Sequence, residues 1–154
     1  MSTKKGRVLY VDDEEINLIN FRETLCDEFE IFTAASGPEA LALLEREGEM
    51  ALVVSDQRMP GMSGIELLVK VRDAYPNTIR MIISAYTEVH ELIEAINQAE
   101  VYRYFVKPWK EDSLRLTIGN AVGTYALGQE IQQFVDQGRK QMAERMQIFE
   151  GDSE

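Results

Sequence analysis

The chain contains one cysteine and one histidine, Cys26 and His90, among its 154 residues. A single cysteine cannot form a disulfide within the chain, and a zinc site has no ligand set because His90 has no Cys or His partner. Apolar runs such as Ala51–Val54 and Met81–Ile83 are far shorter than the ~20 residues that a membrane helix needs. The amino terminus also has no long apolar region followed by a small-residue cleavage site, which a secretory signal requires. We therefore expect a cytoplasmic protein with no membrane partner.

Basic residues are too few to balance the acidic ones. There are 16 Lys and Arg against 27 Asp and Glu, which gives a net charge of −11. Because binding of DNA or RNA depends on Lys and Arg that neutralise phosphates, we expect no direct nucleic acid binding by this region. The length suits one compact domain with a hydrophobic core and a short appendage.

Short apolar runs rich in β-branched residues alternate with segments of helical periodicity. The predicted strands are Arg7–Val11, Phe29–Ala34, Ala51–Ser55, Ile79–Ser84 and Arg103–Val106. The helical segments between them run from Ile16 to Leu25, Ala40 to Leu44, Ile65 to Arg72 and Leu92 to Ile96. This alternation predicts parallel βαβ units joined by right-handed crossovers. We therefore predict an α/β protein, a flavodoxin-like (βα)5 three-layer sandwich with a parallel five-stranded sheet.

Helix boundaries are marked by capping residues. Ser36 and Ser63 each stand at a predicted helix start, with Glu39 and Glu66 three residues later, which is the spacing of a capping box. Gly48 is placed to end the second helix. These signals support the same division into helices and strands.

The carboxyl-terminal part has a different pattern. From Asp112 onward there is no strand signal and no proline. Val135, Met142 and Phe149 recur at a spacing of seven, which is typical of coiled coils. Four glycines weaken this pattern, since each costs up to ~1 kcal/mol relative to Ala in a helix: Gly119, Gly123, Gly128 and Gly138.

Two interpretations of this segment remain open. It is either a fifth helix with a frayed tail, or an extended helix that pairs with another chain or leads to an output domain. We assign residues 1–125 to the domain and residues 126–154 to a carboxyl-terminal helical extension.

Polar side chains stand where the predicted strands end. They are Asp12, Asp13 and Glu14 after the first strand, Asp56 after the third, Ser84 at the fourth and Lys107 at the fifth. In parallel α/β sheets, ligands bind outside the carboxyl ends of the strands. Three carboxylates, one hydroxyl and one ammonium are therefore expected to converge at one edge of the sheet.

This set of groups suits phosphoryl transfer. Crowded carboxylates raise one another's pKa unless a cation neutralises them, and Mg²⁺ takes oxygen ligands from one or two carboxylates together with a phosphate. Asp56 precedes a loop with Pro and Gly, and an Asp carboxylate can act as a nucleophile that forms an acyl phosphate. Lys107 and Ser84 would then contact the phosphoryl oxygens. Each element alone is common in loops and caps, so their joint occurrence carries the prediction.

The motifs around these residues resemble the receiver domain of two-component response regulators. They read Val8-Leu9-Tyr10-Val11-Asp12-Asp13-Glu14, Ser55-Asp56-Gln57-Arg58-Met59-Pro60-Gly61-Met62-Ser63-Gly64, Ile83-Ser84-Ala85 and Phe105-Val106-Lys107-Pro108-Trp109. The resemblance covers about residues 6 to 125 and implies that Asp56 is the phosphoacceptor in a phosphorelay. The donor would be a sensor histidine kinase or a phosphotransfer protein.

The resemblance also implies roles for the neighbouring residues. Asp13 and Asp56 would bind the metal directly, Asp12 largely through water, and the backbone carbonyl of Arg58 would be a further ligand. Ser84 and Tyr104 match the switch positions of the family, and the Lys107–Pro108 bond is expected to be cis. We also predict that phosphorylation switches dimerisation or output, through a homodimer whose geometry or affinity depends on phosphorylation and on the carboxyl-terminal helix.

Two positions depart from simple chemotaxis-type receivers. Arg58, two residues after the acceptor, and Tyr86, two after Ser84, are bulky. Such positions resemble those that control access of the hydrolytic water, so they bear on the lifetime of the phosphoryl group. Receivers that contain the stretches Asp-Gln-Arg-Met-Pro-Gly, here residues 56–61, and Tyr-Arg-Tyr-Phe-Val-Lys-Pro-Trp, here residues 102–109, usually belong to longer regulators or hybrid kinases with varied outputs.

Two other classes of function use some of the same residues. A phosphatase of the haloacid dehalogenase type also uses an Asp nucleophile, Mg²⁺ and Lys, but has a second Asp where this chain has Arg58. We therefore expect that the protein is not a turnover enzyme and that it catalyses only its own phosphoryl transfer and dephosphorylation. A degenerate, phosphate-independent interaction module would have lost Asp56, the acidic pair or Lys107, and all of these are present.

Overall fold

A computed structural model describes residues 5–85, 93 and 96–152. Five parallel strands form one sheet in the order β2-β1-β3-β4-β5. The strands are β1 (Arg7–Val11), β2 (Glu30–Ala34), β3 (Leu52–Asp56), β4 (Ile79–Ala85) and β5 (Arg103–Lys107). Each boundary lies within one residue of the prediction from the sequence, and the predicted flavodoxin-like fold is confirmed.

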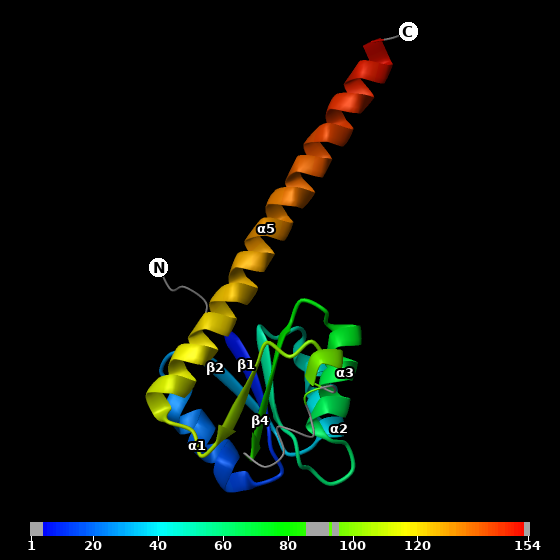
Figure 1. Cartoon of the computed structure of the whole chain (residues 1–154). Coiled ribbons are helices and arrows are strands. Elements are labelled where there is room, and N and C mark those ends of the chain that lie inside the picture. The colour runs from blue at the N-terminus through cyan, green and yellow to red at the C-terminus, as the bar shows by residue number, and fades with distance from the viewer. Residues whose placement is uncertain (1–4, 86–92, 94–95, 153–154) are drawn as a thin grey trace.

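Helices cover both faces of the sheet (Figure 1). They are α1 (Glu15–Leu25), α2 (Gly37–Glu47), α3 (Gly64–Ala74) and α5 (Glu111–Asp152). Successive residues of a strand point to opposite faces, so β1 contributes to two cores. Val8 and Tyr10 pack with α1 and α5, whereas Leu9 and Val11 pack with α2 and α3. This burial on both faces explains why the strands read as nearly continuous apolar runs.

The predicted caps of α2 and α3 are confirmed. The Ser36 hydroxyl accepts a hydrogen bond from the Glu39 N–H at 3.2 Å, and Ser63 accepts one from the Glu66 N–H at 3.2 Å. Gly48 ends α2 with a φ of 89°, a conformation that favours glycine. The predicted helix from Leu92 to Ile96 lies mostly outside the described residues.

The carboxyl-terminal segment is one helix of 42 residues rather than a short helix with a frayed tail. Its first part is anchored by the buried side chains of Leu114, Ile118 and Ala121. Beyond Tyr125 the helix projects away from the domain (Figure 1). Added side-chain atoms would meet nothing within 4 Å at Gly123, Gly128 or Gly138, so these glycines weaken the helix without marking close contacts. None of the described helices is apolar enough over its length to cross a membrane.

Candidate functional site

The strand register places the predicted site residues at one edge of the sheet. Val11, just before Asp12, is level with Ser55, and Asp56 is level with Ile83. Ser84 is level with Val106, just before Lys107. The strand order reverses around β1 and β3, so Asp12 and Asp56 flank the topological switch point where ligands of such sheets bind.

Asp12 is the buried hub of the site. Its side chain is fully enclosed, and its Oδ1 accepts a hydrogen bond from the Glu14 N–H at 3.0 Å. Its Oδ2 accepts hydrogen bonds from the Tyr10 hydroxyl at 2.6 Å, from the Asn17 amide at 3.1 Å and from Lys107 Nζ at 3.4 Å. These four donors hold the carboxylate in one orientation.

Asp56 lies nearer the surface, with a side chain that is 10% exposed. Its Oδ1 accepts a hydrogen bond from the Gln57 N–H at 3.0 Å, and its Oδ2 lies 3.2 Å from Lys107 Nζ. Burial raises the pKa of this carboxyl to about 6, while Lys107 opposes the shift and Asp12 adds to it. The group is thus a carboxylate whose charge is poorly compensated in the metal-free protein.

Lys107 connects the residues at the ends of β1 and β3. Its Nζ pairs with both Asp12 and Asp56. The peptide bond between Lys107 and Pro108 is cis, as predicted. Burial alone would lower the pKa of Lys107, but the charges of Asp56 and Asp12 outweigh it and the net pKa is raised. Lys107 therefore remains an ammonium.

The other predicted site residues lie around this centre. Asp13 is exposed beside Asp12, and Arg58 is exposed on the loop after β3. The Ser84 side chain is buried at the end of β4, where its hydroxyl donates a hydrogen bond to the Ala85 carbonyl at 3.3 Å. Tyr104 on β5 is 49% exposed. Tyr86 lies outside the described residues, and the role of each of these side chains stays a prediction.

The carboxylates fit a divalent cation. One ligand oxygen from each of Asp12, Asp13 and Asp56 can be chosen so that all lie within 4.8 Å of one another. Three carboxylates against the single ammonium of Lys107 leave an excess of negative charge. An oxygen-rich donor set with this excess is what Mg²⁺ prefers.

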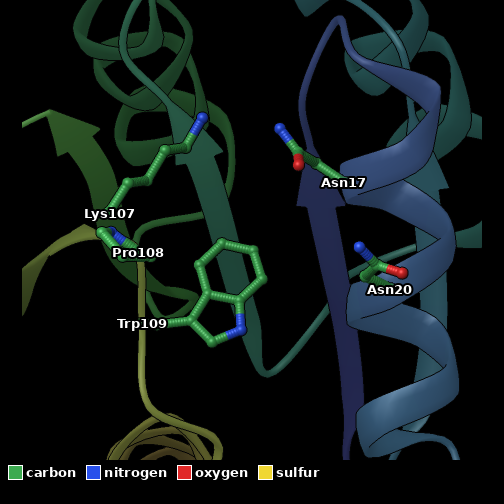
Figure 2. Close-up of a pocket in the computed structure, with 5 residues that line it drawn as sticks. All are labelled: Asn17, Asn20, Lys107, Pro108 and Trp109. Atoms are coloured by element: carbon green, nitrogen blue, oxygen red, sulfur yellow. The ribbon is translucent and has the colours of Figure 1, made fainter.

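A cavity of about 470 Å³ opens beside Lys107 (Figure 2). Asn17 and Asn20 line it from α1, Lys107 lines it from the end of β5, and Pro108 and Trp109 line it from the segment that follows. In Figure 2 the indole of Trp109 lies between the two sides, below the ammonium of Lys107. The cavity thus has both polar and apolar walls, and it reaches the site through Lys107.

Three residues that support the site were not predicted. Tyr10 and Asn17 donate to Asp12, and the Gln57 side chain accepts a hydrogen bond from the Ile65 N–H at 2.9 Å, which fixes the loop after Asp56 to the start of α3. Tyr10 was visible in the sequence as a hydroxyl in an apolar strand two residues before Asp12, and so on the same face. Burial raises the pKa of its phenol far above the usual range, so Tyr10 is a hydrogen-bond donor.

The sequence matches the family model described as the response regulator receiver domain over residues 8–119. The chain belongs to this family. Among curated relatives, the hydrogenase transcriptional regulatory protein HoxA of Cupriavidus necator is 42% identical over 127 residues, which cover 82% of this chain and 26% of HoxA. The alginate biosynthesis transcriptional regulatory protein AlgB of Pseudomonas aeruginosa is 35% identical over 91% of this chain and 31% of AlgB. The receiver thus spans between a quarter and a third of the length of these regulators.

Solved structures show the same fold. The chemotaxis protein CheY4 of Vibrio cholerae superposes with a TM-score of 0.70 at 28% identity, covering 76% of this chain and 98% of CheY4. A structure described as adenylate cyclase from Rhodopirellula baltica has a TM-score of 0.81 at 30% identity and covers 86% of this receiver and 98% of that chain. The predicted membership of the response regulator receivers is confirmed.

Proposed function

We propose that this receiver accepts a phosphoryl group on Asp56 from a sensor histidine kinase or a phosphotransfer protein. The observation that carries the proposal is the convergence of Asp12, Asp13 and Asp56 at the carboxyl edge of the sheet, where Lys107 pairs with Asp12 and Asp56. An Asp56 oxygen would bond to phosphorus as the bond from phosphorus to the donor nitrogen breaks. The product is an acyl phosphate on this chain, and we expect the receiver to turn over no other substrate.

Mg²⁺ would be held by Asp13 and Asp56, with Asp12 acting through water and the Arg58 backbone carbonyl as a further ligand. The metal would neutralise charge on the phosphoryl oxygens. Lys107 would leave the carboxylates and pair with one phosphoryl oxygen, and Ser84 would donate to another. The burial of Ser84 and the half-exposed position of Tyr104 support a switch in which Ser84 moves toward Asp56 and Tyr104 turns inward.

The test is intact-mass spectrometry after incubation with acetyl phosphate. We expect addition of one phosphoryl group with Mg²⁺ present, none with EDTA, and none on the Asp56→Asn variant. Asp73→Asn, which alters an exposed carboxylate on α3, is the matched control and should be labelled like the wild type. Undiminished labelling of Asp56→Asn would refute the assignment.

We also infer that the receiver domain comprises residues 1–125 and that the extension 126–154 mediates homodimerisation. Support comes from large apolar side chains that α5 exposes beyond the domain, namely Leu127, Ile131, Phe134, Val135, Met142 and Met146. Phe134 is 81% exposed, and an exposed apolar stripe of this length marks an interaction surface. A second copy of the helix would bury it.

Sedimentation velocity with and without beryllofluoride tests this inference. Phe134→Glu should weaken self-association, whereas Gln133→Glu, at an exposed polar neighbour, should not. Both variants should take up phosphate at Asp56 normally. A wild-type chain that stays monomeric at high concentration under both conditions would rule out the dimer.

A further inference from the structure

Tyr10 is a buried phenol whose position is fixed by aromatic contacts. It is fully enclosed on β1. Its ring stacks on Phe21 with centroids 4.2 Å apart and meets Trp109 edge-on at 6.2 Å. These contacts aim the hydroxyl at the site, where it donates to Asp12 Oδ2 at 2.6 Å. This is the shortest of the hydrogen bonds that Asp12 accepts.

The oxygen that Tyr10 contacts is shared with Lys107. Nζ of Lys107 lies 3.4 Å from Oδ2 of Asp12 and 3.2 Å from Oδ2 of Asp56, so the ammonium stands between two carboxylates. Tyr10 and Asn17 reach the same oxygen of Asp12 from β1 and α1. Of the three donors to this oxygen, Lys107 is the one that the proposed function requires to change partner.

A change of partner by Lys107 would affect Asp12 most. Asp12 is fully buried, and the loss of a donor to a buried carboxylate is costly, because hydrogen bonds to charged groups are stronger than neutral ones and an unpaired buried group carries its full desolvation cost. The Tyr10 hydroxyl and the Asn17 amide remain on the oxygen that the ammonium leaves. The cost of moving Lys107 is therefore set by how well these two donors satisfy Asp12 without it.

We propose that Tyr10 is a positioning residue for phosphoryl transfer, which holds the Asp12 carboxylate so that Lys107 is free to leave it for the phosphoryl group on Asp56. The inference rests on the proposed function and adds a role for a residue outside the acidic cluster. Without the hydroxyl, Asp12 would depend more on Lys107 and would retain it. Phosphoryl transfer would then be slower although every residue of the acidic cluster and Lys107 is intact.

The first test is a double-mutant cycle in the absence of metal and phosphoryl donor. Tyr10→Phe keeps the ring and removes one oxygen, and Lys107→Met removes the ammonium. Urea unfolding with EDTA present is measured for the wild type, both single variants and the double variant. We expect Lys107→Met to raise the unfolding equilibrium constant about tenfold more in the Tyr10→Phe background than in the wild type, the lower end of what a charged hydrogen bond is worth.

The second test is the rate of labelling by acetyl phosphate at saturating Mg²⁺, followed by intact mass. Tyr10→Phe should be labelled more slowly by up to the same factor of about ten. The matched control is Tyr125→Phe, because the Tyr125 hydroxyl also donates to a carboxylate, Glu49, at 2.5 Å. The register places this pair beyond the opposite end of the sheet, since Glu49 precedes β3. We expect Tyr125→Phe to be labelled at the wild-type rate and to be additive with Lys107→Met.

The outcomes separate the two proposals. A coupled cycle with slower labelling of Tyr10→Phe supports the positioning role. An additive cycle overturns it, as does labelling of Tyr10→Phe at the wild-type rate. A wild-type protein that is not labelled at all refutes the proposed function, while the unfolding cycle still decides whether Tyr10 and Lys107 act on each other through Asp12.

Discussion

Replacing Asp56 by Asn should make the metal-free protein more stable, although it removes the proposed acceptor. The carboxyl is 10% exposed and its pKa is raised to about 6, against about 3.9 in an unfolded chain. Each pKa unit corresponds to about 1.36 kcal/mol. The ionised form therefore costs the folded state about 2–3 kcal/mol, and the neutral amide of Asn avoids this cost.

The sign of the pH dependence follows from the raised pKa. A carboxyl with a higher pKa in the folded state binds protons more readily when folded, so its contribution to stability improves as the pH falls. The penalty is full above about pH 6 and is gone below the unfolded value of about 3.9. The free energy of unfolding of Asp56→Asn should therefore exceed that of the wild type most at pH 8, and the difference should shrink toward pH 4.5.

Urea unfolding followed by circular dichroism, with EDTA present, measures this difference. Asp13→Asn makes the same change of charge at an exposed position, where charges interact weakly through water, and should stabilise the protein less. The reasoning is refuted if Asp56→Asn is no more stable than the wild type at pH 8. It is also refuted if the difference between the two proteins stays constant down to pH 4.5.

Three further predictions concern packing, capping and signalling. Gly64→Ala should lower the free energy of unfolding in urea by about 1–3 kcal/mol, because the added Cβ would clash with the Asp56 backbone oxygen. Gly123→Ala should instead raise it by about 0.5–1 kcal/mol, because a Cβ at Gly123 meets open space. Ser36→Ala should cost about 1 kcal/mol in the same assay, through loss of the α2 cap. Lys107→Ala should fold but lose the change in Trp109 fluorescence that phosphorylation produces, and a full change in that signal would contradict the proposed role.

The sequence predicts the strand ends and the residues at them because both depend on short-range patterns. Asp12, Asp56, Ser84 and Lys107 each follow an apolar run, and parallel pairing brings the ends of such runs to one edge. No knowledge of side-chain orientation is needed for this step. The convergence of the acidic cluster could therefore be predicted before the fold was known.

Features that depend on distant partners could not be predicted. Arg80 interrupts the apolar run of β4, yet its side chain is buried and donates to the carbonyls of Ala99 at 3.0 Å and Thr78 at 2.8 Å. The partner at Ala99 comes from a loop whose course the sequence does not indicate. The raised pKa of Asp56 likewise depends on burial. Tyr10 and Lys107 both donate to Asp12, and these contacts depend on the side-chain rotamers of the three residues.

The projecting part of α5 also has a mechanical consequence. Residues 126–152 continue the helix beyond Tyr125, and at about 1.5 Å per residue they extend it by roughly 40 Å. A tilt of about 5° where the helix leaves the domain would move its far end by about 3.5 Å over that length. The angle at which α5 leaves the domain is set by its own buried side chains and by the bond from Tyr125 to Glu49. A small tilt of α5 at the domain would thus produce, at the far end of the helix, a shift comparable to the spacing between packed side chains.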